Sequence, residues 1–298
     1  MFSLSFNHLR LFIVSLAAMA AMSLLSGCKG DNDTKPLLIV TIPPQKYFLE
    51  QIVGDKMEVK SLLSQSANPE NYEPGISHMV DLDRAMAYFT IGNIGFESAM
   101  LPKLKENNPD LPVIGTIEGV ALLTGTHDHC GHKAHEHGLP DPHTWSSVKN
   151  ARVIAANMAA AVEKLDSVNK DYYHSRFIAF DSRLDSIDRS IENRLSSLRQ
   201  RSFLIWHPSL AYFARDYDLE QIAVGQEGKE ASAIELGGKI EKAISQGVSM
   251  FFYQRDFDSR QAEAFNKHVN ARIVEINPMN GNWEDEINLI VNSLDGNN

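Results

Sequence analysis

The chain has 298 residues, with 38 acidic residues against 28 lysines and arginines and a formal net charge of −10. This balance, without a basic cluster, argues against nucleic acid as a partner. A modest acidic excess suits an exported protein or a cation ligand, although it discriminates weakly between function classes. Roughly 270 residues follow the N-terminal segment, which is more than one core usually holds and predicts two domains.

The N-terminal segment has the layout of an export signal. His8 and Arg10 precede an apolar run over 11–25, and Ser26-Gly27 stand directly before Cys28. The run is too short for a membrane span, and the small residues before cysteine resemble the bacterial lipobox. We therefore expect a signal peptide over 1–27, lipidation at Cys28 and a tether over 28–36. The alternative is an ordinary signal peptide with an incidental cysteine. Several acyl chains at about 0.8 kcal/mol per methylene would anchor the exported protein durably to a membrane.

From residue 37 onward, short apolar runs alternate with helical patterns. This alternation predicts an α/β fold with mainly parallel sheets covered on both faces. The expected strands cover 37–40, 59–63, 87–91, 112–115, 203–206, 221–224, 250–253 and 272–276.

Two stretches of the chain share one layout. An apolar strand runs into Pro43 and, four residues later, the pair Tyr47-Phe48, and the same order recurs at Pro208 and Tyr212-Phe213. The later strands also recur about 160 residues downstream, which indicates an internal repeat. We therefore predict two similar lobes, over 37–168 and 200–298, each with a four-stranded sheet.

A long periodic segment separates the halves. Apolar residues recur at three- and four-residue steps from Tyr173 to Leu198, without an interrupting glycine or proline. We predict one rigid linker helix over 169–199, about 45 Å long, that spans both lobes and permits only small relative movement. The alternative for such a stripe is the seam of a coiled-coil dimer, whereas the linker interpretation predicts a monomer.

Histidines concentrate between the first half and this helix. The stretch 126–145 holds more than half of the eleven histidines, interspersed with carboxylates. This composition favours metal binding over a solvated polar loop. After Cys28, Cys130 is the one cysteine left, and it is either a further metal ligand or incidental. The expected metal-binding loop covers 126–138 and comprises His127, His129, His132, His135 and His137.

Four polar residues follow the ends of predicted strands. In parallel sheets, ligands bind beyond the carboxyl ends of the strands. We therefore expect Glu70, His143, His207 and Asn277 to meet in one cleft between the lobes. Imidazole, carboxylate and amide oxygen are ligands for a divalent first-row metal. Glu73 competes with Glu70 for the carboxylate role, and a single histidine beside a strand is more often simply hydrogen-bonded.

At these residues the chain resembles the zinc- and manganese-binding receptors of bacterial ABC importers. The motifs that carry the resemblance cover 68–74, 141–145, 207–213 and 275–278. The resemblance implies two α/β lobes joined by a long helix, and a high-affinity receptor that captures a divalent metal, zinc first, and delivers it to a membrane permease. It also implies that the histidine-rich loop is an accessory collector or sensor, as in the zinc-type branch.

Two positions depart from the family pattern. The family has histidine where this chain has Glu70, and usually aspartate where it has Asn277. The ligand set is therefore richer in oxygen, which should weaken Zn2+ binding and admit Mn2+ or Fe2+. His78, His174 and His268 lie on predicted helices and are expected to be surface residues.

Other function classes fit less well. A zinc hydrolase needs a placed general base, and neither an HExxH-like helix nor a second acid provides one. We therefore predict no catalytic residues. A cell-surface adhesin is a further alternative that is compatible with metal delivery. The predicted location is an exported lipoprotein in the periplasm or on the cell surface.

Overall fold

The computed structural model describes residues 35–69, 72, 75–124, 140–225, 232–254 and 259–296. Residues from Pro36 onward form one compact unit. Several predictions fall outside the described residues. They are the signal peptide, Cys28, nearly all of the tether, Glu70, Glu73 and the histidine-rich loop with its five histidines and Cys130.

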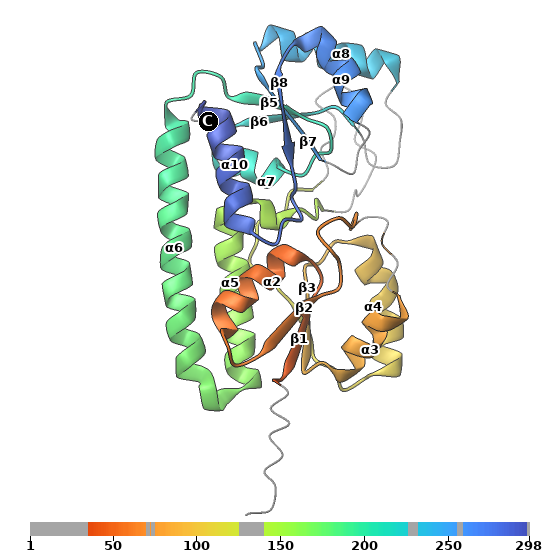
Figure 1. Ribbon diagram of the computed structural model, residues 1–298, viewed down its shortest axis with the longest axis vertical. Coiled ribbons are helices and arrows are strands. Elements are labelled where there is room, and N and C mark those ends of the chain that lie inside the picture. Colours follow the sequence, from red (N-terminus) through yellow and green to blue (C-terminus); the bar gives the residue numbers. More distant parts are fainter. Residues whose placement is uncertain are drawn as a thin grey trace, which may run out of the picture. The chain divides into compact units, whose positions relative to one another are not determined.

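The N-terminal lobe is built on four parallel strands, all in the first part of the chain (Figure 1). They are β1 (Leu37–Val40), β2 (Glu58–Ser61), β3 (Ala87–Thr90) and β4 (Val113–Gly115). Their order in the sheet is β2-β1-β3-β4. The helices of this part are α2 (Pro43–Val53), α3 (Ile76–Arg84) and α4 (Gly95–Asn107).

The C-terminal lobe repeats the same topology. Its strands are β5 (Ser202–Ile205), β6 (Glu220–Ala223), β7 (Met250–Gln254) and β8 (Arg272–Ile276). They are parallel and follow the order β6-β5-β7-β8, which is the order of the first sheet shifted by four strands. The helices are α7 (Ala211–Asp216), α8 (Ala233–Ser245), α9 (Ser259–Val269) and α10 (Trp283–Asp295). The predicted duplication is therefore present in the fold.

Local sequence explains how the first lobe starts. All four residues of β1 are buried, as expected for a central strand in a sheet that is covered on both faces. Helix α2 begins at Pro43-Pro44, where the missing backbone N–H groups need no partner. It ends at Gly54, whose φ of +56° suits glycine. Strand β2 ends at Ser61, two residues before the predicted end.

The long connector is α6 (Lys170–Ser196), preceded by α5 (Val148–Leu165) and a short 3-10 turn, η2 (Ser167–Asn169). With 27 residues, α6 is about 40 Å long. It packs against α5, against α2 of the first lobe and against α10 of the second (Figure 1). The buried side chains of its apolar stripe are Tyr173, Phe180, Leu184, Ile191 and Leu195.

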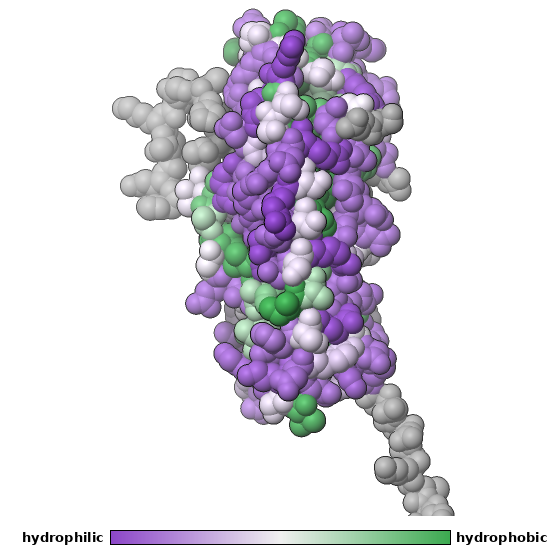
Figure 2. Space-filling view, turned by 90° about the vertical axis from the view of Figure 1, so that its left-hand side faces the viewer, coloured by the Kyte–Doolittle hydropathy of each residue, from purple (hydrophilic) through white to green (hydrophobic). Residues whose placement is uncertain are grey.

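The face of the molecule that shows α6 is mainly hydrophilic (Figure 2). Because the apolar stripe of α6 packs against helices of its own chain, it offers no continuous seam for a second copy. The coiled-coil alternative is therefore not supported. None of the described helices is long and apolar enough to cross a membrane.

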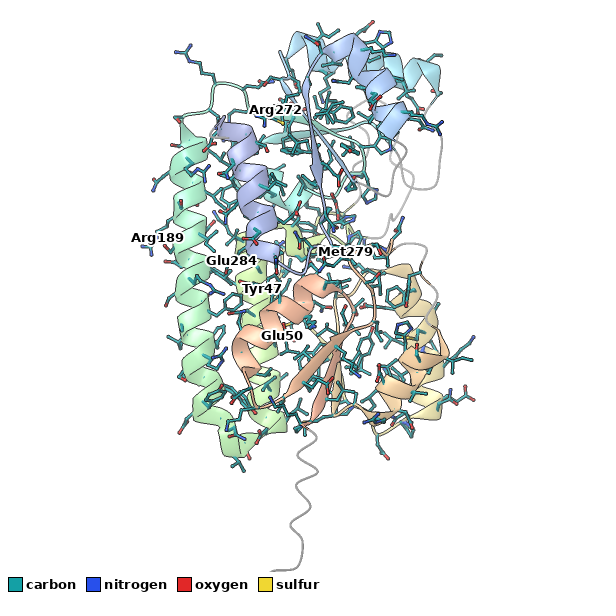
Figure 3. All side chains as sticks on the ribbon, in the orientation of Figure 1. Tyr47, Glu50, Arg189, Arg272, Met279 and Glu284 are labelled. Carbon is teal, nitrogen blue, oxygen red and sulfur yellow. The ribbon has the colours of Figure 1, made fainter. Side chains whose placement is uncertain are left out.

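The two lobes share one hydrophobic core that includes residues of both sheets. Trp283 at the start of α10 packs edge-on against Phe48 of α2, with ring centroids 5.0 Å apart. Tyr47 and Glu284 lie side by side where α2 meets α10 (Figure 3). Arg183 of α6 contacts both of them, with its guanidinium 2.9 Å from the Tyr47 hydroxyl and 2.8 Å from the Glu284 carboxylate. These contacts hold the lobes together on the α6 side of the cleft.

The predicted fold class is confirmed: two four-stranded parallel lobes are joined by one long helix. Most strand ends lie within one or two residues of the expected positions. The expected linker over 169–199 is shorter at its C-terminal end, because α6 stops at Ser196.

Candidate metal centre

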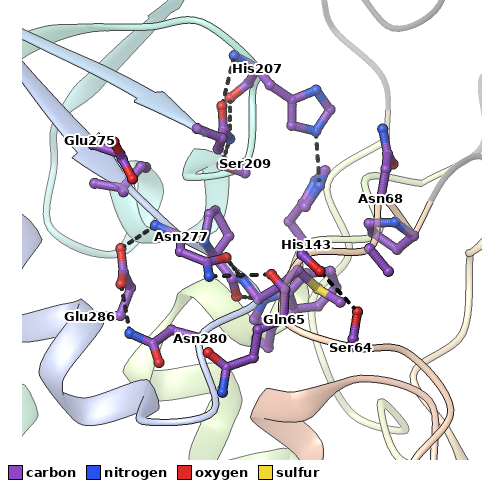
Figure 4. Close-up of a pocket in the computed structure, with 18 of the residues that line it drawn as sticks. Ser64, Gln65, Asn68, His143, His207, Ser209, Glu275, Asn277, Asn280 and Glu286 are labelled. Carbon is purple, nitrogen blue, oxygen red and sulfur yellow. Dashed lines mark hydrogen bonds between the residues drawn. The ribbon is translucent and has the colours of Figure 1, made fainter. Parts of the chain in front are cut away.

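A cavity of about 630 Å3 lies between the lobes, at the carboxyl ends of strands from both sheets. Its lining includes Asn68 and His143 from the first lobe and His207 and Asn277 from the second (Figure 4). The topology thus brings together the segments that follow β2, β4, β5 and β8. This is the edge at which ligands bind in parallel sheets.

His143 is held in one orientation by Asp141. The imidazole is almost fully buried, at 3% exposure. The Asp141 Oδ1 atom accepts a hydrogen bond from the His143 backbone N–H at 2.8 Å and lies 2.9 Å from its ring Nδ1. A carboxylate at Nδ1 favours the tautomer with the proton on that nitrogen, which makes Nε2 the ring nitrogen that can accept a hydrogen bond or bind a metal. Asp141 thus fixes the orientation of the His143 ring.

His207 reaches the same point from the other lobe. Its Nε2 atom lies 3.2 Å from the Nε2 atom of His143, and the ring centroids are 5.0 Å apart (Figure 4). Two imidazole nitrogens that bind one tetrahedral zinc at about 2.0–2.1 Å are roughly 3.3 Å apart. The observed separation therefore fits two ligands of one metal ion, with one ligand supplied by each lobe.

Asn277 lines the cavity but also cross-links the lobes. Its Nδ2 group donates a hydrogen bond to the backbone oxygen of Gln65 at 3.3 Å. Its Oδ1 atom accepts one from the Met279 backbone N–H at 3.0 Å. The backbone N–H of Asn277 donates to Glu286 Oε1 at 2.6 Å. Burial raises the pKa of the Glu286 carboxyl group, partly offset by hydrogen bonds from Asn277 and Asn280.

The carboxylate predicted at Glu70 lies outside the described residues, but its neighbours are placed. Asn68 and Pro69 line the cavity. The Tyr72 hydroxyl lies 3.3 Å from the backbone oxygen of Leu62 and 3.2 Å from the His78 ring. His78, expected at the surface, is therefore half-buried against the segment that carries Glu70. Within the described part of the chain, no three His, Cys, Asp or Glu side chains form a group suited to a metal ion.

The ends of the histidine-rich loop meet in a closed base. Thr124 pairs with Pro140 in an antiparallel bridge, and the Asp141 N–H donates to the Leu123 carbonyl at 2.8 Å. Tyr212 of the second lobe fastens this base, because its hydroxyl donates to the Asp141 carbonyl at 2.7 Å and accepts from the Leu123 N–H at 3.2 Å. The two chain segments that flank the loop are therefore held together next to His143.

Two tryptophans, Trp145 and Trp283, form hydrogen bonds beside the cavity. Trp145 lines the cavity, and its indole N–H donates to the Pro278 carbonyl across the lobes at 2.8 Å. Trp283 in turn donates to the Trp145 carbonyl at 2.7 Å. Trp206 does not line the cavity. Its ring packs against Phe251 within the second lobe, with centroids 6.4 Å apart. At the end of β5, Trp206 lies against a second, smaller hydrophobic cluster that is formed by residues of this lobe alone.

Asp141 and Tyr212 have roles that were not predicted from the sequence. The spacing of Asp141 two residues before His143 is a usable signal, since a short acidic side chain there can turn back to the imidazole. Nothing in the local sequence indicates that Tyr212 reaches the other lobe.

The fold and the cleft are those of a two-lobed substrate-binding protein. A family model described as zinc-uptake complex component A, periplasmic (ZnuA), matches residues 38–294, and the chain therefore belongs to the ZnuA family.

Individual relatives agree with this assignment. The zinc-binding lipoprotein AdcA of Streptococcus pneumoniae R6 is 26% identical over 284 residues, which cover 91% of this chain and 56% of AdcA. The chain thus spans little more than half of that protein. ZnuA of Bacillus subtilis, named a high-affinity zinc uptake system protein, is 23% identical over 93% of this chain and 90% of its own length.

Solved structures show the same architecture. A crystal structure of ZnuA superimposes with a TM-score of 0.80 at 33% identity, covering 88% of this chain and 98% of that one. A deletion mutant of ZnuA with zinc bound gives a TM-score of 0.78 at the same identity, covering 87% and 98%.

Proposed function

We propose that this protein is the extracytoplasmic receptor of a divalent-metal importer, with zinc as its first substrate. The observation that carries the proposal is the pair of Nε2 atoms, 3.2 Å apart, that His143 and His207 present from opposite lobes. A metal ion bound to both nitrogens would link the lobes across the cleft. Membership of a family described by zinc uptake supports the same conclusion.

The proposed ligand set is Glu70, His143 and His207, with Asn277 as the fourth candidate. His143 is pre-oriented by Asp141, so little ordering is needed when the metal binds. Asn277 keeps its amide oxygen on the Met279 N–H, so ligation would require that oxygen to serve two partners. The set is rich in oxygen compared with three imidazoles and one carboxylate, and we expect measurable binding of Mn2+ or Fe2+ as well.

Delivery would follow from a permease that docks on both lobes. A small displacement of one lobe separates the two imidazoles and so weakens the metal site. The shared core and the contacts around Arg183 permit only small relative movement, which suits release by distortion instead of wide opening.

In this proposal Cys28 carries the lipid that keeps the receptor beside its permease, and the histidine-rich loop gathers metal next to the cleft. AdcA, a relative of this chain, is itself named a lipoprotein.

The test is competitive metal binding on the chain that starts after Cys28, comparing Zn2+, Mn2+ and Fe2+. It uses the wild-type loop and a variant in which residues 125–139 are removed and the closed base is joined by a short linker. One tight zinc site that survives loop deletion and is lost in His143→Ala and in His207→Ala is the expected result. Zinc binding that disappears with the loop, or that persists in both alanine variants, would place the site elsewhere.

Membership of a zinc-uptake family argues against the alternative of a zinc hydrolase, and the same protein preparations test it. A receptor yields its metal to an external chelator and turns over no ester or peptide, whereas a hydrolase keeps its metal and shows turnover. The alternative of a surface adhesin makes no prediction about the two imidazoles.

A further inference from the structure

Gln254 is a buried polar side chain that the metal site as described does not use. It is the last residue of β7, in a strand whose preceding residues are mostly apolar, and is only 6% exposed. Strand β7 lies between β5 and β8 in the sheet, so Gln254 stands between the segments that carry His207 and Asn277. A carboxamide at this depth needs partners for both its oxygen and its nitrogen.

The partners of Gln254 belong to the segment that carries His207. Its Oε1 atom accepts a hydrogen bond from the His207 backbone N–H at 3.4 Å. Its Nε2 group donates to the His207 carbonyl at 3.3 Å and to the Ser209 hydroxyl at 2.7 Å. One carboxamide therefore contacts both polar groups of the His207 backbone.

This arrangement continues the sheet beyond the end of β5. The ladder between β5 and β7 closes with Ile205 opposite Phe252 and with the Trp206 N–H donating to the Phe252 carbonyl at 2.9 Å. At His207, the next residue along the chain, the Gln254 carboxamide supplies the hydrogen-bond partners that a peptide group of a neighbouring strand would otherwise supply. It is itself held from the other side, because the Gln254 backbone pairs with Ile276 of β8. The His207 backbone is thereby held beyond the end of the β5 ladder, where its carbonyl also accepts a hydrogen bond from the Ser209 N–H at 2.8 Å.

We propose that Gln254 is a positioning residue that sets the metal affinity and the release rate of the cleft by fixing the His207 backbone. The inference rests on the proposed function, because it assumes that His207 binds the metal. Asp141 orients the His143 imidazole by contacting its ring nitrogen, whereas Gln254 orients the His207 imidazole by binding the His207 backbone. Removal of such outer partners of a metal ligand typically costs 10- to 100-fold in affinity.

The test replaces Gln254 by methionine, which has a similar length and no hydrogen-bonding amide. The matched control is Gln45→Met in the first lobe, where an equally buried carboxamide binds Thr41, Ile42 and Thr116 and no predicted ligand. Zinc release to an excess of chelator is followed in the chain that starts after Cys28. The visible spectrum of bound Co2+ reports the ligand geometry, and the midpoint of thermal unfolding reports stability.

The expected result is zinc release about tenfold faster in Gln254→Met, together with an altered Co2+ spectrum. Gln45→Met should lose comparable stability while its release rate and spectrum match the wild type. Ser209→Ala removes a single partner of Gln254 and should give a smaller acceleration, about threefold on the same scale, even if Gln254→Met does not fold.

The inference is overturned if Gln254→Met or Ser209→Ala releases zinc within twofold of the wild-type rate with an unchanged Co2+ spectrum. Equal effects in Gln45→Met would also overturn it, because a general loss of stability would then explain the change. A wild-type protein without tight zinc binding would instead refute the proposed function itself, so the two failures are distinguishable.

Discussion

Replacing Asp141 tests how much of the metal affinity comes from orientation of His143. The Asp141 Oδ1 atom lies 2.8 Å from the His143 backbone nitrogen and 2.9 Å from its Nδ1 atom, and both groups are buried, with their side chains 9% and 4% exposed. In Asp141→Ala the Nδ1–H group loses its acceptor, and the ring is free to rotate and to change tautomer. Loss of an orienting carboxylate of this kind corresponds to a 10- to 100-fold weaker site, or about 1.4–2.7 kcal/mol.

Zinc affinity is measured by competition with a chelating dye, in a background that lacks residues 125–139. The control is Asp188→Asn, which alters a buried aspartate of α6. This aspartate accepts a hydrogen bond from the Tyr217 hydroxyl at 2.7 Å and does not line the cavity. This control should keep wild-type affinity. If Asp141→Ala also bound zinc within twofold of the wild type, metal binding by His143 would not depend on its carboxylate partner, and the orienting role given to Asp141 would be wrong.

Three further predictions concern the frame around the cleft. Arg183→Ala should lower the free energy of unfolding by about 1 kcal/mol in urea titrations, because the arginine joins α2 to α10. The control Arg189→Ala removes only an ion pair within α6 and should lower it by under about 0.5 kcal/mol. Equal losses would contradict the role given to Arg183. Trp283→Phe keeps a ring beside Phe48 but leaves the Trp145 carbonyl without its indole donor, so urea denaturation should show a loss of about 1 kcal/mol, and an unchanged midpoint would contradict the bond. Burial raises the pKa of the Glu97 carboxyl group above its ordinary value of 4.5. The folded protein therefore binds this proton more tightly than the unfolded chain does. The contribution of Glu97 to the free energy of unfolding falls as pH rises through the raised pKa. The stability of Glu97→Gln relative to wild type should therefore increase above pH 4.5 in denaturation series, and a constant difference would refute this linkage.

Much of the fold was predictable because it depends on local patterns of apolar residues in the sequence. The eight described strands are three to five residues long, and β1, β3, β5 and β7 are mainly apolar. The two lobes repeat a strand, proline and aromatic-pair order that can be compared directly. The apolar stripe of α6 has the helical period over many turns. Its packing partners, α2 and α10, come from distant parts of the chain, and the sequence did not name them.

The sequence predicted that His143 and His207 lie in one cleft, but it did not predict their contacts. The rule that ligands gather at strand ends brought His143 and His207 to one cleft, and the structure places their Nε2 atoms within 3.2 Å. The roles of Gln254 and Tyr212 were missed because they depend on hydrogen bonds between segments 47 and 71 residues apart. Such long-range polar contacts leave no periodic trace in a single sequence.

Asn277 illustrates the same limit. Its position after β8 predicted a ligand, and it does line the cavity. The side chain also caps its own turn and donates to Gln65 across the lobes, contacts that the residue type alone does not distinguish from metal binding.

The most direct test of this account is a crystal structure of the chain that starts after Cys28, grown with zinc, with anomalous diffraction recorded at the zinc edge. The proposed metal site requires an anomalous peak in the cleft, about 2.0–2.1 Å from the Nε2 atoms of both His143 and His207. A zinc peak that contacts neither imidazole would contradict it.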